Sequence, residues 1–383
     1  MTNHAFASAL RPVATGSPAT RAGRALGIAV LSVALSGFMT TRADAQLLDD
    51  RLAIHGFLSQ AWARAWDNPI AGIPTGGSTF DYRAVAIQIG YGLSDADRVV
   101  IQLNHRRSGQ SALEGTENRV RLNWAFYERR FGAGTVRIGK VPFSAGLFNE
   151  LRNVGTVLPF YRAPLHFYGD GSETMDGVIL SYRFWSRNAW SLVAEASAGQ
   201  FDMLLALNDS TGGQFVVENE VRELIAANVW LEAPWAETRI GVGGSNYEET
   251  SFTGAEQPRT NWWTISAESK PGPVTIRAEY MQAKTPEYTF RAKYAQAGLR
   301  ILPSVNLNAQ TEFSHMLIET PFGEIDLELA HDHALGVAWS LAPNVVLKLE
   351  GHRFKGFGVD RFVAFGETLP EARYAIASIA VGF

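Results

Sequence analysis

The chain has 383 residues, of which 34 are Lys or Arg and 38 are Asp or Glu, and it contains no cysteine. A net charge of −4 argues against nucleic-acid binding, which requires a concentrated positive surface, and the lack of cysteine excludes disulfides and thiolate metal sites. Hydrophobic residues make up 46% of the chain, yet the mean hydropathy is −0.05, so apolar and polar residues are finely interleaved.

The N-terminus has the three parts of an export signal. Basic residues come first, an apolar run over 25–39 follows, and small residues at 43–45 precede Gln46. The basic residues are Arg11, Arg21 and Arg24. We therefore predict a signal peptide over 1–45, with an N-terminal membrane helix as the alternative reading.

Removal of residues 1–45 would leave a mature chain of 46–383. Because that segment holds four arginines and one aspartate, the mature chain would carry a net charge of −7. No later segment offers the ~20 consecutive apolar residues that a membrane helix needs.

Alternation with a period of two, which is typical of β-strands, recurs along the mature chain. The stretch 119–131 shows the pattern, with Val120, Leu122, Trp124 and Phe126 on one predicted face and Arg119, Arg121, Asn123 and Arg129 on the other. Such a strand could belong to a soluble sheet or to a membrane barrel with lipid on one side and water on the other.

Reading the alternation along the chain predicts sixteen strands in one domain. They cover 52–66, 79–92, 98–107, 118–131, 135–143, 173–185, 190–201, 220–232, 238–247, 260–269, 274–284, 289–301, 305–316, 328–341, 345–354 and 372–383. An even number lets the first and last strands pair antiparallel, so we expect a closed all-β antiparallel barrel. A soluble β-solenoid is the alternative.

The predicted connections alternate between short turns and longer loops. The short turns are rich in Gly, Pro, Asn, Asp and Ser, as at 94–97, 132–134 and 270–273. The longer connections lie near 67–78, 108–117, 144–172, 202–219, 248–259, 317–327 and 355–371, and a short one at 285–288 breaks the rule. Short turns at one end and long loops at the other are typical of an outer-membrane barrel.

Two segments resemble a known family. The last strand ends in Phe383, which resembles the assembly signal of Gram-negative outer-membrane proteins. The stretch 137–171 resembles the fifth strand and third loop of Gram-negative porins, in the broad family that includes phosphate-selective members. The matching positions are Gly139, Lys140, Pro142, Gly146, Asn149, Glu150 and Arg152, and 55–62 resembles a first mature strand.

The resemblance implies a location, an assembly and a role for the long third loop. A porin lies in the outer membrane, usually as a homotrimer, and its third loop (here about 144–172) folds into the lumen and narrows it. No cofactor is implied.

Charged residues near this loop are the candidate pore-lining and constriction residues. Four arginines on three consecutive predicted strands face inward by parity: Arg106, Arg119, Arg121 and Arg137. Exposure to lipid would cost ~2–4 kcal/mol for each arginine near the midplane, which favours the inward assignment. They form a positive strip, or they only pair with carboxylates such as Glu195 or Glu279.

Acidic residues in and after the loop could oppose this strip across the constriction: Glu150, Asp170, Glu173 and Asp176. Such an arrangement would set a transverse field that sorts ions. Alternatively, Glu150 pairs locally with Arg152 or Arg162.

Aromatic side chains have two expected positions. Tyr161, His166, Phe167 and Tyr168 either guide a solute or anchor the loop to the wall. Interfacial girdles at the two membrane edges are expected from several of Trp62, Trp66, Tyr91, Trp124, Trp190, Trp230, Trp263 and Trp339.

Motifs for catalysis or metal binding are weak. The stretch 134–141 fits G-x-x-x-x-G-K, but Val141 replaces the Ser or Thr that would hold magnesium. His331 and His333 share one strand face without an evident third ligand.

The sequence therefore predicts a passive diffusion channel for small hydrophilic solutes, with an anion preference set by the arginine strip. The alternatives are a non-conducting barrel that serves as an adhesin or scaffold, and an outer-membrane hydrolase. We expect neither catalysis nor a bound metal.

Overall fold

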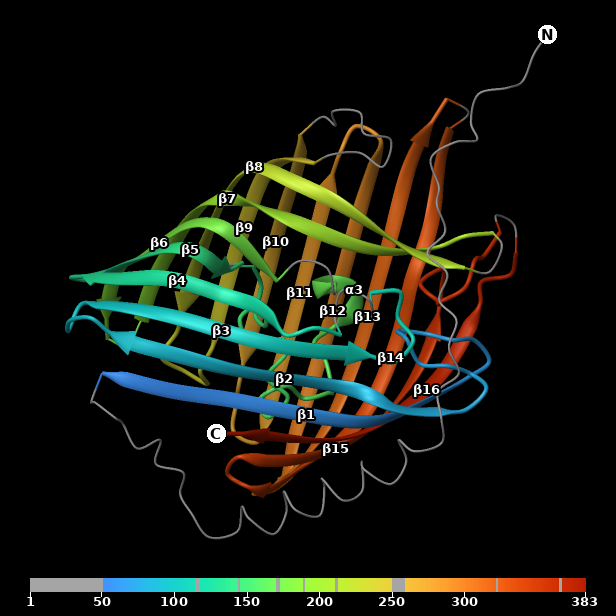
Figure 1. Cartoon of the computed structure of the whole chain (residues 1–383), viewed down its shortest axis with the longest axis horizontal. Coiled ribbons are helices and arrows are strands. Elements are labelled where there is room, and N and C mark those ends of the chain that lie inside the picture. The colour runs from blue at the N-terminus through green and yellow to red at the C-terminus, as the bar shows by residue number, and fades with distance from the viewer. Residues whose placement is uncertain are drawn as a thin grey trace. The chain divides into compact units, whose positions relative to one another are not determined.

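The computed structural model describes residues 51–113, 118–143, 145–169, 173–188, 190–210, 213–249, 259–321, 323–364 and 367–383. The predicted signal peptide, 1–45, and Asp170 lie outside these residues. In the described chain, sixteen strands form one closed barrel, as predicted, rather than a solenoid (Figure 1).

Every strand pairs antiparallel with its neighbours in chain order, and β1 pairs with β16. The elements are β1 Leu52–Trp66, β2 Ser78–Gly92, β3 Asp97–Ser108, β4 Arg121–Phe131, β5 Gly134–Pro142, α3 Leu165–Tyr168, β6 Thr174–Arg187, β7 Trp190–Asn208, β8 Gln214–Glu232, β9 Arg239–Glu249, β10 Thr260–Ser269, β11 Val274–Lys284, β12 Tyr288–Leu302, β13 Val305–Thr320, β14 Gly323–Ala342, β15 Val345–Lys355 and β16 Glu371–Gly382.

The chain end completes the closure. The Gly56 amide donates to the Phe383 carbonyl at 2.8 Å, and the Phe383 amide donates back to the Gly56 carbonyl at 2.9 Å. Ten residue pairs, from Phe57 with Gly382 to Trp66 with Arg373, join β1 to β16. The pairing leaves no open sheet edge at the junction of the two termini of the barrel.

Two of the predicted long loops are wrong. β7 continues to Asn208 and β8 already begins at Gln214, so most of the predicted loop 202–219 is strand. In the same way, β13 continues to Thr320 and β14 begins at Gly323. β-Bulges lie where these extensions begin, at 199–201, 222–225 and 314–315, and they shift the alternation, so the pattern is interrupted although the pairing continues. The other connections follow the alternation of short and long, again with the exception near 285–288.

The two faces of each strand differ in burial. On β12, Ala292, Tyr294 and Gln296 are buried on the inner face, whereas Lys293 and Ala295 between them are exposed on the outer face. The same alternation holds around the barrel and follows from the period of two in the sequence. Inner positions carry polar, aromatic and small apolar side chains, the last mainly as alanines on β1, β2, β14 and β16, and many outer positions carry larger aliphatic ones.

A bulge in β4 reverses part of the predicted face assignment. Gln102 of β3 pairs with Trp124, but the next residue, Leu103, pairs with Leu122, so Asn123 is the extra residue. Trp124 and Phe126 therefore lie on the inner face, where uninterrupted alternation had placed them outside. Phe126 is buried there, with the guanidinium of Arg137 at 5.5 Å from its ring centre.

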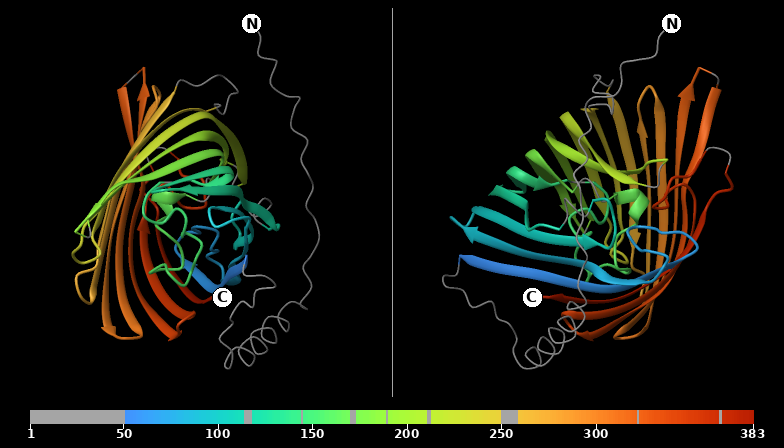
Figure 2. Two further views of the ribbon diagram at one scale, coloured as in Figure 1. Left: turned by 90° about the vertical axis from the view of Figure 1, so that its left-hand side faces the viewer. Right: turned by 45° about the vertical axis from the view of Figure 1, so that its right-hand side comes forward.

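Apolar clusters fill parts of the barrel interior. One cluster contains buried residues of β3, β4, β5, β6 and β8. Another connects β11 and β12 with residues 147–168, which lie between β5 and β6 in the chain. In both views of Figure 2, α3 lies within the ring of strands. No helix in the described ranges is long and apolar enough to cross a membrane.

Candidate functional site

The connection from β5 to β6 runs through the barrel interior over residues 145–169, here called the inner segment. Its residues touch the inner faces of strands on the opposite side of the ring, including β11, β13 and β15. At Gly155 it also approaches β1 so closely that a Cβ atom would lie 2.1 Å from the Ser59 hydroxyl oxygen.

Three glutamates on alternate strands hold the inner segment. Glu279 of β11 accepts the Leu147 amide at 2.9 Å, and Glu350 of β15 accepts the Tyr161 amide at 2.8 Å. Glu312 of β13 accepts two successive amides, those of residues 166 and 167, at 2.6 and 2.9 Å. All three carboxyl groups are buried, and their oxygens satisfy backbone amides that would otherwise lack a partner inside the barrel.

Glu279 is the most highly connected of the three. It also accepts hydrogen bonds from the hydroxyls of Tyr168, Ser266 and Tyr294, the last at 2.5 Å. Burial and the neighbouring carboxylate raise the pKa of the Tyr168 phenol well above its usual value, so the phenol stays protonated and donates. The Phe148 amide in turn donates to the Tyr168 oxygen at 2.9 Å.

Donors from the wall and from the inner segment itself satisfy the segment's carbonyl groups. Lys348 donates to the Phe160 carbonyl at 2.6 Å, and Asn308 donates to the Pro159 carbonyl at 3.2 Å. Arg152 donates to the Tyr168 carbonyl at 2.7 Å. Buried backbone groups need such partners, so this irregular segment is stable inside the barrel.

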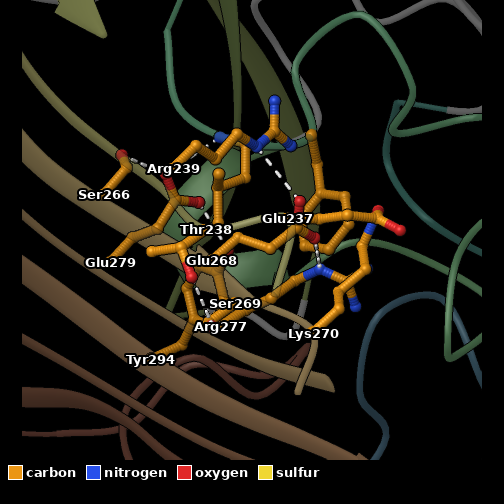
Figure 3. Close-up of polar contacts among 12 residues, drawn as sticks. Glu237, Thr238, Arg239, Ser266, Glu268, Ser269, Lys270, Arg277, Glu279 and Tyr294 are labelled. Atoms are coloured by element: carbon orange, nitrogen blue, oxygen red, sulfur yellow. Dashed lines mark hydrogen bonds and ion pairs between the residues drawn. The ribbon is translucent and has the colours of Figure 1, made fainter. Parts of the chain in front are cut away.

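Glu279 and the groups that donate to it, from Leu147, Tyr168, Ser266 and Tyr294, are called the Glu279 cluster here. A network of charged side chains lies next to it (Figure 3). Glu268 of β10 accepts from Arg239 at 3.0 Å and from Arg277 at 2.5 Å. The Arg277 guanidinium also lies 5.3 Å from the ring centre of Phe148 in the inner segment. Arg277 thus links the wall of β9–β11 to the inner segment.

The predicted arginine strip is paired with the acidic residues that were expected to oppose it across a passage. Arg106 of β3 bonds Glu173 at 2.9 Å. Arg137 of β5 bonds Glu128 at 3.0 Å and Glu150 of the inner segment at 2.8 Å. Glu150 therefore pairs with Arg137 on the wall rather than with Arg152 or Arg162 of its own segment.

Two hollows along β3–β8 bring the predicted residues together. One has a volume of about 310 Å3 and is lined by Arg98, Glu128, Arg130, Arg137, Glu150 and Glu195. The other has a volume of about 450 Å3 and is lined by Arg106, Arg121, Lys140, Glu173, Asp176, Asp202 and Glu218. Positive and negative side chains are nearly balanced in both.

The remaining predicted residues have different environments. Arg119 is exposed and precedes β4, which begins at Arg121, so it lies outside the strand predicted to carry it. Arg152 lies 3.9 Å from Glu173 and is buried. Arg162 donates to the Tyr82 hydroxyl and lies over its ring at 5.3 Å.

The aromatic residues of the inner segment serve mainly as anchors. Phe167 and Tyr168 are buried in one cluster with Tyr294 of β12. Tyr161 packs on Tyr82 with a ring separation of 5.2 Å, and His166 stacks on Phe354 at 5.6 Å.

Two of the predicted girdle tryptophans lie inside the barrel instead. Trp124 lines a small hollow with Asn149 and Arg152, and Trp230 packs against the cluster that holds the inner segment. Trp66, Trp263 and Trp339 are exposed on the outside.

The sequence alone did not indicate the anchoring role of Glu279, Glu312 and Glu350 or the pairing role of Glu128. A signal was present, because each is an acidic residue at an inner position of an alternating strand. Parity gives the face of a residue, but only the fold shows which distant segment reaches it.

Among the described residues, no group of three or more His, Asp or Glu side chains could hold a metal ion. His331 and His333 lie on the outer face of β14, with ring centres 4.5 Å apart.

Comparison with known proteins identifies the fold. No protein-family profile and no curated protein sequence matches the chain. Among solved structures, the trimer form of OmpT from Vibrio cholerae is 12% identical, with a TM-score of 0.56, over 87% of this chain and 99% of that one. The anion-selective porin from Comamonas acidovorans is 13% identical, with a TM-score of 0.54 and the same coverage.

A third similar structure, the outer membrane channel DcaP of Acinetobacter baumannii, is 10% identical, with a TM-score of 0.56, over 87% of this chain and 97% of that one. At these identities the similarity concerns the fold, which was predicted correctly from the sequence.

Proposed function

We propose that this chain, which has the fold of the sixteen-stranded outer-membrane porins, is a water-filled channel. Small hydrophilic solutes and ions would cross the outer membrane through it by passive diffusion. The observation that carries the proposal is the pair of hollows along β3–β8, about 310 and 450 Å3, which are lined by charged side chains; the smaller one also includes Glu150 of the inner segment.

The contrast between the two faces supports a membrane location. Many outward side chains are aliphatic, for example Ile101, Val242, Ile265, Leu335 and Leu349, each more than one-third exposed. Exposed apolar surface of this extent is stable in lipid, whereas charged lining side chains need water. In barrels of this kind the long connections face the outside of the cell.

Export requires the N-terminal signal, and its cleavage is a separate prediction. We expect the chain recovered from the outer membrane to begin at Gln46, which N-terminal sequencing would test. Recovery of the intact N-terminus from the inner membrane would favour the membrane-helix reading instead.

Passive diffusion can be tested by osmotic swelling of liposomes that contain the refolded protein. Small neutral sugars should cause swelling at rates that fall as the sugar grows, because the lining is polar but not shaped for one solute. A folded barrel that gives no swelling with any sugar would favour the non-conducting scaffold.

Ion selectivity should be weak in the unmodified chain. The arginine strip would favour anions, but Glu150 and Glu173 neutralise Arg137 and Arg106 directly. Field lines concentrate in a narrow aqueous passage, so small changes in its charge alter selectivity.

The double variant Glu150→Gln and Glu173→Gln should shift the reversal potential in a salt gradient toward that of an anion channel. The matched control Glu232→Gln removes an exposed carboxylate that lies away from both hollows and should leave the reversal potential unchanged. If the double variant conducts but its reversal potential is unchanged, Glu150 and Glu173 do not determine the ion selectivity of the channel.

The proposed assembly is a homotrimer. The trimer form reported for the Vibrio protein of the same fold supports it. Light scattering of the refolded protein in detergent should give three chains per particle, and a single chain per particle would contradict the proposal.

A further inference from the structure

The outer surface of β12–β15 carries a cluster of basic side chains that the channel does not use. We call Arg291, Lys293, His315, His331, His333, Arg353 and Lys355 the outer basic patch. Each occupies an outer position that alternates with buried inner residues such as Ala292, Ser314, Ala330 and Phe354.

Strand pairing places these side chains side by side. Lys293 pairs with Phe313, Phe313 with His331, and His331 with Lys355. Two residues before Lys293, and on the same face of β12, Arg291 pairs with His315 of β13. The patch is therefore continuous across four strands, although the residues come from distant parts of the sequence.

The patch lies directly above the apolar band. Along the outer face of β12, four apolar positions from Ile301 to Ala295 are followed by Lys293 and Arg291. On β14 the same face changes from Leu335 to His333 and His331. A charge costs ~2–4 kcal/mol at the bilayer midplane and much less near an interface, so this level should be a membrane interface.

A hollow of about 340 Å3 lies within this surface and has the lining of a binding site. It is lined by Arg291, Lys293, His315 and Asp326, together with the rings of Tyr280 and Phe313 and with Leu317. The Lys293 ammonium lies 5.3 Å from the Phe313 ring centre. A guanidinium and an ammonium beside flat apolar surfaces suit a phosphorylated headgroup with a ring-shaped body.

The nearby carboxylates neutralise only part of the patch. Asp326 bonds His315 at 3.3 Å, Glu328 lies 3.8 Å from His331, and Glu371 bonds Arg353 at 3.3 Å. Within the described residues, no carboxylate forms a salt bridge with Lys293 or Lys355, although Glu371 lies opposite Lys355 in the strand register. The patch thus keeps a positive charge at the edge of the apolar band.

We propose that the outer basic patch binds the phosphate groups of a glycolipid in the outer leaflet, with the headgroup in the hollow between Arg291 and Phe313. This rests on the proposed membrane location, because that location puts the long-connection end, and hence the patch, at the outer leaflet. The apolar band below it would receive the acyl chains.

The test uses the refolded mature protein in detergent and a diphosphorylated lipid A as the probe, with binding measured by native mass spectrometry. The double variant Arg291→Gln and Lys293→Gln should bind on the order of thirtyfold more weakly, since each Lys or Arg near an anionic surface contributes about fivefold. Lipid A without its phosphates should bind the unmodified protein equally weakly.

The matched control is the double variant Arg129→Gln and Lys270→Gln, which removes two cations at the short-turn end, one exposed and one half-buried. It should bind lipid A as the unmodified protein does. Channel conductance of the Arg291→Gln and Lys293→Gln variant should be unchanged, which separates this proposal from the proposed function.

Four results would overturn the proposal. They are undiminished binding of lipid A by the folded patch variant, equal binding of the phosphate-free lipid, displacement of lipid A by millimolar inorganic phosphate, and loss of trimers in the patch variant without lipid. The third would identify a site for free phosphate, and the fourth an interface between subunits.

Discussion

Glu279 is the residue on which the position of the inner segment most depends. Its carboxylate accepts hydrogen bonds from the Leu147 amide and from three hydroxyls that belong to the inner segment and to two neighbouring strands. A carboxylate offers only acceptor sites, so four donors can converge on it. An amide at the same position would turn one half of the group into a donor.

Glu279→Gln should therefore destabilise the folded barrel by about 1–3 kcal/mol, because at least one buried donor loses its acceptor. Thermal unfolding in detergent, followed by circular dichroism, would show a lower midpoint. Single-channel recordings should also become noisier as the inner segment loosens.

The control for this change is Glu232→Gln, an exposed carboxylate at the end of β8. Its midpoint should equal that of the unmodified protein. Equal midpoints for both variants would show that the Glu279 cluster does not hold the inner segment.

At the scale of single elements, β4 shows both what alternation predicts and where it fails. The strand was predicted from its alternation, and its face assignment is right for Arg121, before the bulge. Beyond the bulge at Asn123 the faces are reversed, so Trp124 and Phe126 are inside. The residue pattern alone does not reveal a bulge, because both the polar and the apolar side chains of this strand have favourable places inside.

The reversal can be tested by cysteine substitution, since the chain has no native cysteine. Trp124→Cys should react with a charged, membrane-impermeant thiol reagent added to vesicles, because position 124 lines an interior hollow. Ala125→Cys, the adjacent residue, should not react, because it faces the lipid. Reaction at position 125 but not at position 124 would show that the alternation continues through β4 without a bulge.

The inner segment illustrates a second limit of the sequence. Its place in the interior was implied by resemblance, and its acidic residues were read as opposing the arginines at a distance. The actual pairs, such as Arg137 with Glu150, depend on the path of the backbone through the barrel. Strand periodicity carries no information about that path, so the site was predicted less completely than the barrel.

At the scale of the whole molecule, stability depends on closing β1 against β16. Gly56 sits at this junction, where a Cβ atom would lie 2.3 Å from the Phe383 ring and 2.8 Å from the Ala86 carbonyl oxygen. Even a methyl group there must displace the last residue or the neighbouring strand. Sheet closure leaves little freedom for such a shift.

Gly56→Ala should consequently destabilise the barrel by about 1–3 kcal/mol and lower the temperature up to which the folded barrel persists in detergent. Gly90→Ala is the matched control, because a Cβ atom there meets nothing closer than 3.9 Å. Semi-denaturing gel electrophoresis at increasing temperature would compare the two. If Gly90→Ala were the more destabilised variant, close packing of Gly56 against Phe383 would not limit the stability of the closed barrel.

The measurement that most directly tests the proposed channel is the single-channel conductance of the refolded mature protein in a planar lipid bilayer. We expect stepwise conductance with weak ion selectivity, because the lumen contains two hollows with nearly balanced charge along β3–β8. A barrel that is demonstrably folded and inserted but gives no conductance steps would contradict it, and would show that the inner segment closes the lumen.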